Sequence, residues 1–108
     1  MRILNEVLLA SGNMSGNITS PAVSTAHMGY LTVAAIYVGT VPTGTLKLQC
    51  SLDSGVNWID IPSMSVAISA SGSSLFEMKE FGYPQVRAVY TFTSGTGSLL
   101  LQVNGKGF

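Results

Sequence analysis

The chain has 108 residues, of which 46% are apolar and only 9% are charged, and five basic side chains balance five acidic ones. This length fits one domain with one core. Soluble domains usually carry about 25% charged residues, so such weak charge repulsion favours a protein that buries part of its outside in an assembly. The scattered Lys and Arg residues argue against nucleic-acid binding, and no apolar run approaches the roughly 20 residues of a membrane span.

The N-terminal part predicts short strands separated by polar loops. Residues 3–10 form the first apolar segment, which Asn5 and Glu6 interrupt. The interruption argues against a signal peptide, so residues 1–10 are read as a strand or as an N-terminal arm. A polar loop over residues 11–17 precedes a weaker edge strand over residues 18–24, since Pro21 cannot donate to a ladder.

The central part predicts one buried strand and one hairpin. Residues 29–38 are apolar on both faces, which is typical of a central strand between two layers. Residues 45–61 then form a β-hairpin in which Asp53 bonds backbone N–H groups and Gly55 adopts positive φ. Trp58 opens the return strand as a core aromatic, so Trp58→Ala is expected to cost about 3–5 kcal/mol.

The C-terminal half continues the strand pattern over residues 63–70, 75–79, 86–93 and 98–104. The last two strands are expected to pair as an antiparallel hairpin through the turn at residues 94–97. Strands at spacings near ten residues, with no sustained helical periodicity, predict an all-β fold. We expect a single domain over residues 1–108, a two-layer antiparallel β-sandwich of jelly-roll type with about eight strands.

The sequence gives little support for a catalytic or metal-binding site. Cys50, the one cysteine, is expected to be a buried thiol. His27 lacks a recognisable nucleophile, and of the nearest carboxylate pair, Asp53 and Asp60, the first is engaged in the turn. No residues have metal-ligand spacing. We therefore expect no enzyme, no cofactor and no metal; the alternative of a small hydrolase would require a cleft with His27 beside a carboxylate.

Two resemblances accompany these patterns. Residues 51–58 fit Ser-x-Asp-x-Gly-x-x-Trp and resemble the Asp-box, a structural hairpin of sialidase-type propellers, although 108 residues cannot build a propeller. Residues 44–62, 86–91 and 94–99 together resemble small β-sandwich virion structural proteins of tailed bacteriophages. Cys50 and Leu52 depart mildly from that pattern.

The second resemblance implies a protein of the virion, made in the bacterial host cytoplasm, with neither nucleic acid nor membrane as a partner. It implies a homo-oligomer, with a trimer as one option, that binds the major capsid protein or a tail protein. The role would be that of a capsid decoration (cement) protein, a minor capsid subunit or a tail component. Candidate contacts lie at the apolar chain ends, and the alternative is that these ends complete the protein's own sandwich: Ile3, Leu4, Val7, Leu8, Leu9 and Phe108.

The main alternative is a tail-associated or fibre-associated carbohydrate-binding module. Such modules stack sugars on aromatic side chains. The available rings are Tyr30, Tyr37, Trp58, Tyr83 and Tyr90. Because Tyr37, Trp58 and Tyr90 are expected in the core, few rings remain for a sugar platform.

Overall fold

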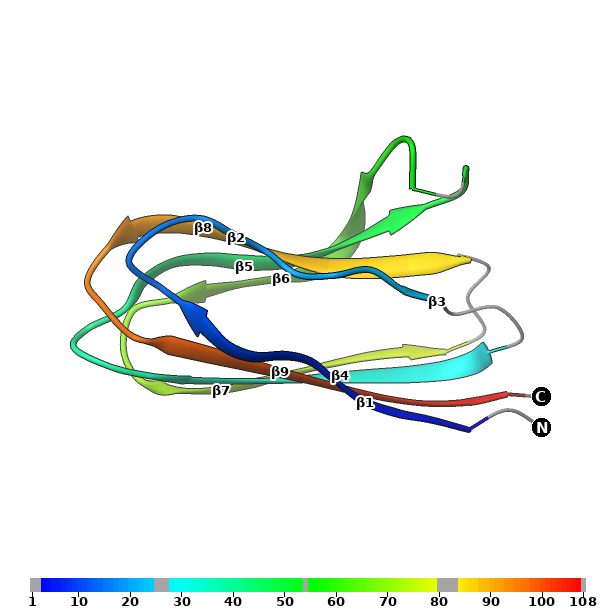
Figure 1. Ribbon diagram of the computed structural model, residues 1–108, viewed down its shortest axis with the longest axis horizontal. Helices are drawn as coiled ribbons and strands as arrows, with labels where there is room; N and C mark the ends of the chain where they lie inside the picture. The colour runs from blue at the N-terminus through cyan, green and yellow to red at the C-terminus, as the bar shows by residue number, and fades with distance from the viewer. Residues whose placement is uncertain (1–2, 25–27, 54, 80–83, 108) are drawn as a thin grey trace.

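A computed structural model describes residues 3–24, 28–53, 55–79 and 84–107. These residues form nine strands and no helix, in two antiparallel sheets packed face to face (Figure 1). The strands are β1 (Ile3–Asn13), β2 (Ile18–Thr19), β3 (Val23–Ser24), β4 (Met28–Val38), β5 (Thr43–Ser51), β6 (Ile59–Ile68), β7 (Gly72–Lys79), β8 (Gln85–Ser94) and β9 (Ser98–Gly107). The all-β sandwich expected from the sequence is confirmed. It follows that no described helix could cross a membrane.

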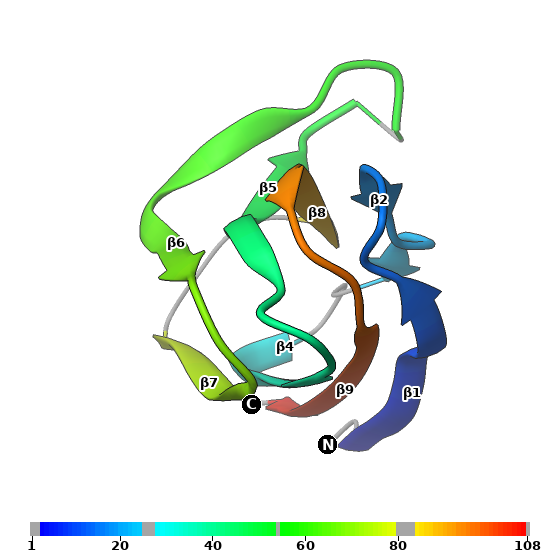
Figure 2. The same ribbon diagram turned by 90° about the vertical axis from the view of Figure 1, so that its left-hand side faces the viewer.

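The strand order is that of a jelly roll. Sheet A has the order β1-β9-β4-β7, and sheet B has the order β2-β8-β5-β6, with β3 also paired to β8. Since β2 and β3 both lie along β8, they count as one interrupted strand, which leaves two sheets of four strands each. Figure 2 shows the two sheets end-on, with β5, β6 and β8 on one side and β1, β4, β7 and β9 on the other.

Sequence neighbours pair directly only once among the described strands, in β5 and β6. Apart from the short step between β2 and β3 along β8, every other connection between them crosses from one sheet to the other, including the turn at residues 95–97 between β8 and β9. The expected β8–β9 hairpin is therefore wrong. The Gly-rich turn is compatible with a tight hairpin and with a crossover, and the long-range pairing of β8 with β5 and of β9 with β4 decides between them.

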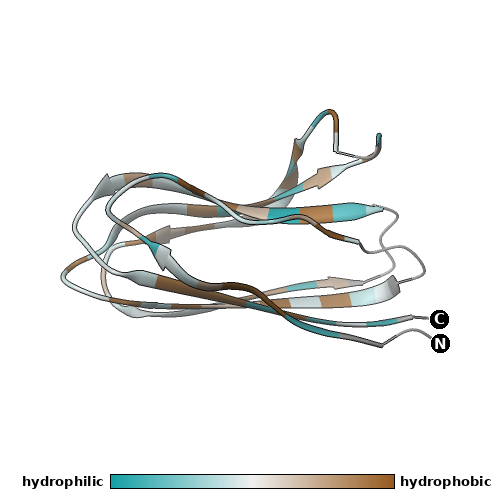
Figure 3. Ribbon diagram, in the orientation of Figure 1, coloured by the Kyte–Doolittle hydropathy of each residue, from teal (hydrophilic) through white to brown (hydrophobic). Residues whose placement is uncertain are grey.

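The core lies between the sheets and is filled by alternate residues of the central strands. Hydropathy alternates along β8 accordingly (Figure 3). The buried members from these strands are Leu31, Val33, Ala35 and Tyr37 in β4, Leu46, Leu48 and Cys50 in β5, Val86, Ala88 and Tyr90 in β8, and Leu99, Leu101 and Val103 in β9. These inward faces agree with the alternation read from the sequence.

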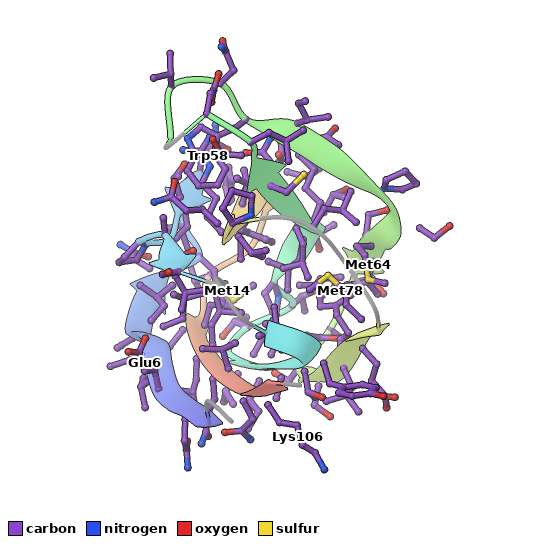
Figure 4. The ribbon with its side chains drawn as sticks, turned by 90° about the vertical axis from the view of Figure 1, so that its right-hand side faces the viewer. Glu6, Met14, Trp58, Met64, Met78 and Lys106 are labelled. Atoms are coloured by element: carbon purple, nitrogen blue, oxygen red, sulfur yellow. The ribbon has the colours of Figure 1, made fainter. Side chains whose placement is uncertain are left out.

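Met14 completes the core from a turn that the sequence predicted to be a polar loop. Its side chain is fully buried, and Figure 4 shows it between the sheets with Met78. The backbone N–H of Met14 donates to the carbonyl oxygen of Gly97 at 2.9 Å. This bond fixes the turn after β1 against the crossover between β8 and β9, so one end of the sandwich is closed by two loops that support each other.

Residues 18–24 form the broken edge strand that Pro21 predicts. Ser20 lies opposite Ala88, and Val23 lies opposite Val86. The edge segment therefore advances three residues where β8 advances two, so it contains one extra residue, a bulge next to the proline. The Ser20 side chain repairs the ladder there, because its Oγ accepts the Ala88 N–H at 2.8 Å. A hydroxyl thus takes the place of a strand carbonyl at the edge of sheet B.

Candidate contact surfaces

The N-terminal segment is a strand of the same sandwich. Residues Ile3–Asn13 pair with β9, with irregular register on both sides of Leu9. Bulges of this kind protect an edge strand from further pairing. Of the predicted contact residues, Val7 is exposed on the outer face, while Leu8 is buried and Leu9 is half-buried against the core.

The other predicted contact residues lie at the two chain ends. The backbones of Ile3 and Leu4 lie opposite Lys106 and Gly105 of β9. Phe108 lies outside the described residues, as do His27 and Tyr83. The structure thus leaves Val7 as the one predicted contact residue whose side chain is placed on an open surface.

The outer face of sheet A carries an apolar cluster that the sequence analysis missed. Outward-facing Ile36 and Val38 of β4 and Leu75 of β7 are exposed, at 45%, 63% and 59% respectively. The expectation that both faces of β4 are covered is wrong, because β4 is central within its sheet but has a second layer on one side only. The apolar pattern on both faces of residues 29–38 was the signal in the sequence for this second apolar surface.

The loop between β5 and β6 is built around Asp53. Its Oδ1 accepts the Asn57 backbone N–H at 2.9 Å and the Ser51 hydroxyl at 2.9 Å, and its Oδ2 accepts from Asn57 Nδ2 at 2.6 Å. The bonds from Asn57, and then the bond from Ser51, hold the pKa of the Asp53 carboxyl below its ordinary value. Gly55 has a φ of 90°, as the reversal requires, and its N–H donates to Ser51 Oγ at 2.8 Å.

This loop projects away from sheet B (Figure 1). Its apolar side chains point outward without cover: Leu52, Val56 and Ile59 are all exposed, Val56 at 77%. A loop held in one conformation by internal hydrogen bonds displays these side chains at a low entropic cost of ordering. Exposed apolar side chains therefore occur on two opposite sides of the sandwich.

Trp58 lies outside the buried core, and the expectation that it is a core aromatic is wrong. The ring is half-buried at the base of the projecting loop (Figure 4), with the Arg87 guanidinium carbon 4.3 Å from the ring centre. A cation over an indole face is attracted by the ring quadrupole. Trp58 thus anchors the loop to β8 on the outer side of sheet B.

A polar network continues from Arg87 across the outer face of sheet B. Arg87 Nε donates to Gln49 Oε1 at 2.9 Å, and Gln49 Nε2 donates to Asp60 Oδ1 at 2.9 Å. Asp60 also pairs with Lys47 Nζ at 3.1 Å. The bonds from Gln49 and then from Lys47 lower the pKa of the Asp60 carboxyl. The network therefore keeps Asp60 ionised and engaged with its neighbours.

Reactive groups are few among the described residues. No three His, Cys, Asp or Glu side chains gather there in a way that could hold a metal. Burial raises the pKa of the Cys50 thiol, which favours the neutral, unreactive form. Asp53 and Asp60 belong to separate hydrogen-bond networks, so neither is placed as one half of an acid–base pair.

Comparison of the sequence with protein-family models and with curated proteins finds no match. Comparison of the fold with solved structures finds likenesses that span nearly all of this chain, although the chain covers little more than a third of the length of one of these neighbours. The chain is similar to the SPBc2 prophage-derived protein YomS, with a TM-score of 0.63 and 10% identity over 95% of this chain and 93% of that one. It is similar to the PBSX exported protein XepA, with a TM-score of 0.69 and 13% identity over 97% of this chain and 37% of that one.

The same fold occurs in a carbohydrate-binding protein. The C-terminal CBM6 of LamC, a laminarinase from Zobellia galactanivorans, matches with a TM-score of 0.52 and 10% identity over 94% of this chain and 98% of that one. The structural neighbours therefore include both phage-derived proteins and carbohydrate-binding modules of all-β fold. At these identities the likeness establishes the β-sandwich fold, and function has to be argued from the surfaces.

Proposed function

We propose that the chain is a structural protein of a bacteriophage particle, which acts by binding further copies of itself and a neighbouring capsid protein as a decoration or minor capsid subunit. The observation that carries the proposal is the exposed apolar cluster on the outer face of sheet A, in a chain with only 9% charged residues. Exposed apolar clusters of this kind mark interaction sites. The full-length likeness in fold to prophage-derived YomS supports a phage origin.

The proposed mechanism is adhesion through preformed surfaces. The hydrophobic effect at sheet A would supply affinity, and the rigid loop between β5 and β6 would supply shape at the other side of the sandwich. No bond is made or broken in such a role. This agrees with the engagement of Asp53 and Asp60 in structural hydrogen bonds.

The experiment is to measure how many copies the particle contains. Particles are purified from cells that produce the phage, and the chain is quantified by mass spectrometry against the major capsid protein. A fixed ratio of hundreds of copies per particle supports decoration, and a few copies per particle places the protein in the tail. Absence from purified particles, with the chain present in the same lysate, would overturn the proposal.

A second candidate is a carbohydrate-binding role in the tail or a fibre. The observation that favours it is the half-buried Trp58 ring beside the planar polar groups of Arg87, Gln49 and Asp60. An aromatic face next to such groups is typical of sugar sites. Tyr30 lies on the outer face of sheet A, so these two rings share no platform. Glycan-array binding that disappears in Trp58→Ala but persists in Tyr30→Ala would support this candidate.

A further inference from the structure

The exposed large apolar side chains divide between two regions of the molecule. Five of the nine lie on the outer face of sheet A, three lie on or beside the projecting loop, and Val41 lies in the connection between β4 and β5. The five on sheet A are Val7, Tyr30, Ile36, Val38 and Leu75. Sheet A therefore presents the larger of the two apolar surfaces.

The apolar residues of sheet A form adjoining cross-strand rows. Leu75 lies opposite Ala34, Ala34 opposite Gln102, and Gln102 opposite Val7, so this row spans all four strands. In the next row, Ile36 lies between Ser73 and the half-buried Leu100. Gln102 separates Val7 from the other apolar residues of its row. Cross-strand neighbours have Cβ atoms about 5 Å apart, so the remaining side chains make one continuous apolar patch: Leu75, Ala34, Ile36 and Leu100.

The patch belongs to a face that is large enough for a stable dimer. Four strands about 4.8 Å apart and about nine residues long have a flat footprint on the order of 600 Å², and a pleated side-chain surface exceeds its footprint. A standard interface buries about 800 Å² on each partner. The three apolar residues of the projecting loop offer a much smaller area.

We propose that the outer face of sheet A binds the same face of a second copy, around a two-fold axis that runs parallel to the strands between β4 and β9. This axis places β4 against β9 of the second copy and β1 against β7 of the second copy. Each cross-strand row of one copy then faces the same row of the other copy. The row that contains Leu75 and Val7 then packs on the same row, as does the row that contains Ile36 and Leu100. Face-to-face sheets pack in this aligned manner about 10 Å apart.

The distribution of charge selects this axis over the perpendicular one. The polar half of the face carries Lys106 opposite Tyr30, and Glu77 opposite Thr32. With the axis parallel to the strands, Lys106 meets Tyr30 of the second copy, a cation over an aromatic ring. With the axis perpendicular to the strands, the charged half would cover the apolar half of the second copy, at a desolvation cost.

The first test measures the mass of the isolated protein in solution by sedimentation equilibrium. We expect the wild type to have twice the mass of one chain. Ile36→Lys and Leu75→Lys should each weaken dimerisation by at least about tenfold, since one charge would be buried beside the axis and the other against Val7 of the second copy. Val56→Lys in the projecting loop is the matched control and should stay dimeric. Circular dichroism should be identical for all four proteins, because the substituted side chains are exposed.

Three results would overturn the proposal. They are a monomeric wild type, a dimer that survives both sheet A substitutions, and a dimer that Val56→Lys abolishes. The second result would indicate pairing through the edge of β7, and the third would indicate docking of the projecting loop.

The second test concerns the direction of the axis. Val7→Cys chains and Leu75→Cys chains are mixed, allowed to exchange, and treated with a bis-maleimide linker about 10 Å long, which matches the spacing of packed sheets. The proposed axis places position 7 of one copy over position 75 of the other, so the mixture should give covalent dimers and each variant alone should not. Cross-linking of either variant alone to the same extent as in the mixture would refute the axis, and so would the absence of covalent dimers from the mixture.

This inference rests on the proposed function in taking self-association as the role of sheet A, but the two fail separately. The isolated protein tests the dimer, whereas its abundance in purified particles tests the phage role. If the protein dimerises in solution but is absent from particles, the proposed interface stands and the proposed phage role is contradicted.

Discussion

Trp58 illustrates how a single side chain can be held at the surface by a contact made far away in the sequence. Its indole packs under the Arg87 guanidinium, which is itself positioned by Gln49. The alternation of residues around the loop predicts an inward Trp58, because nothing local reveals that β8 supplies a cation beside it. The aromatic therefore serves to attach a projecting loop instead of filling the core.

Alanine substitutions distinguish these two roles. Trp58→Ala should destabilise the fold by only about 1 kcal/mol, the usual strength of a partly exposed cation–π contact. Leu48→Ala, which removes a fully buried side chain from β5, should cost about 2–5 kcal/mol. Urea unfolding measures both values. A larger loss in the free energy of unfolding for Trp58→Ala than for Leu48→Ala would indicate that Trp58 is a core residue.

Asp53 makes the conformation of the projecting loop dependent on pH. Its hydrogen bonds lower the carboxyl pKa in the folded protein, so the stabilisation is present above the unfolded pKa, about 3.9, and is lost as pH falls through the folded value. The Asn57 amide resonance should titrate in NMR spectra with a midpoint below 3.9. The matched control, Asp60→Asn, should leave that titration unchanged. A midpoint at or above 3.9 would contradict the network.

At the scale of elements, the edge formed by β2 and β3 depends on polar side chains that replace ladder bonds. Asn17 Oδ1 accepts the Phe92 N–H at 2.8 Å on one side of β2, and Ser20 Oγ accepts the Ala88 N–H at 2.8 Å on the other. Pro21 predicts the break in this edge strand. The pairing of each half with β8 depends on tertiary contacts that local sequence does not specify.

Ser20→Ala tests this repair of the ladder. The substitution leaves the Ala88 N–H buried without its acceptor, which should cost about 1–3 kcal/mol. Ser24→Ala, at the exposed residue of β3, is the matched control and should change the free energy of unfolding by less than about 0.5 kcal/mol. Equal effects of the two substitutions would show that the hydroxyl is dispensable.

The sequence predicts most strands and their inward faces, because alternation is local and the core is apolar. The inward residues of β5, β8 and β9 agree with that alternation. The pairing of β8 with β9 was mispredicted, since the turn chemistry of residues 94–97 fits both a hairpin and a crossover. The exposed face of sheet A was also missed, because periodicity shows that both faces of residues 29–38 are apolar but not that only one of them meets the second sheet.

At the scale of the whole molecule, the apolar residues that stabilise the fold and those exposed on its surface lie in different places. The space between the sheets holds the core, whereas the outer face of sheet A and the projecting loop carry apolar side chains that the core does not use. A small sandwich of this kind can vary its outer faces without changing its interior. This division explains how one fold occurs in phage-derived proteins and in carbohydrate-binding modules.

The most direct test of the central claim, that this protein works by binding to a phage particle, is a rebinding measurement. Particles are prepared from a phage that lacks the gene for the chain, and purified labelled protein is added at increasing concentration before the particles are separated by sedimentation. We expect saturable binding with a fixed number of sites per particle, and no binding to complete particles whose sites are filled. Failure of the folded protein to bind the deleted particles at any concentration would contradict the account.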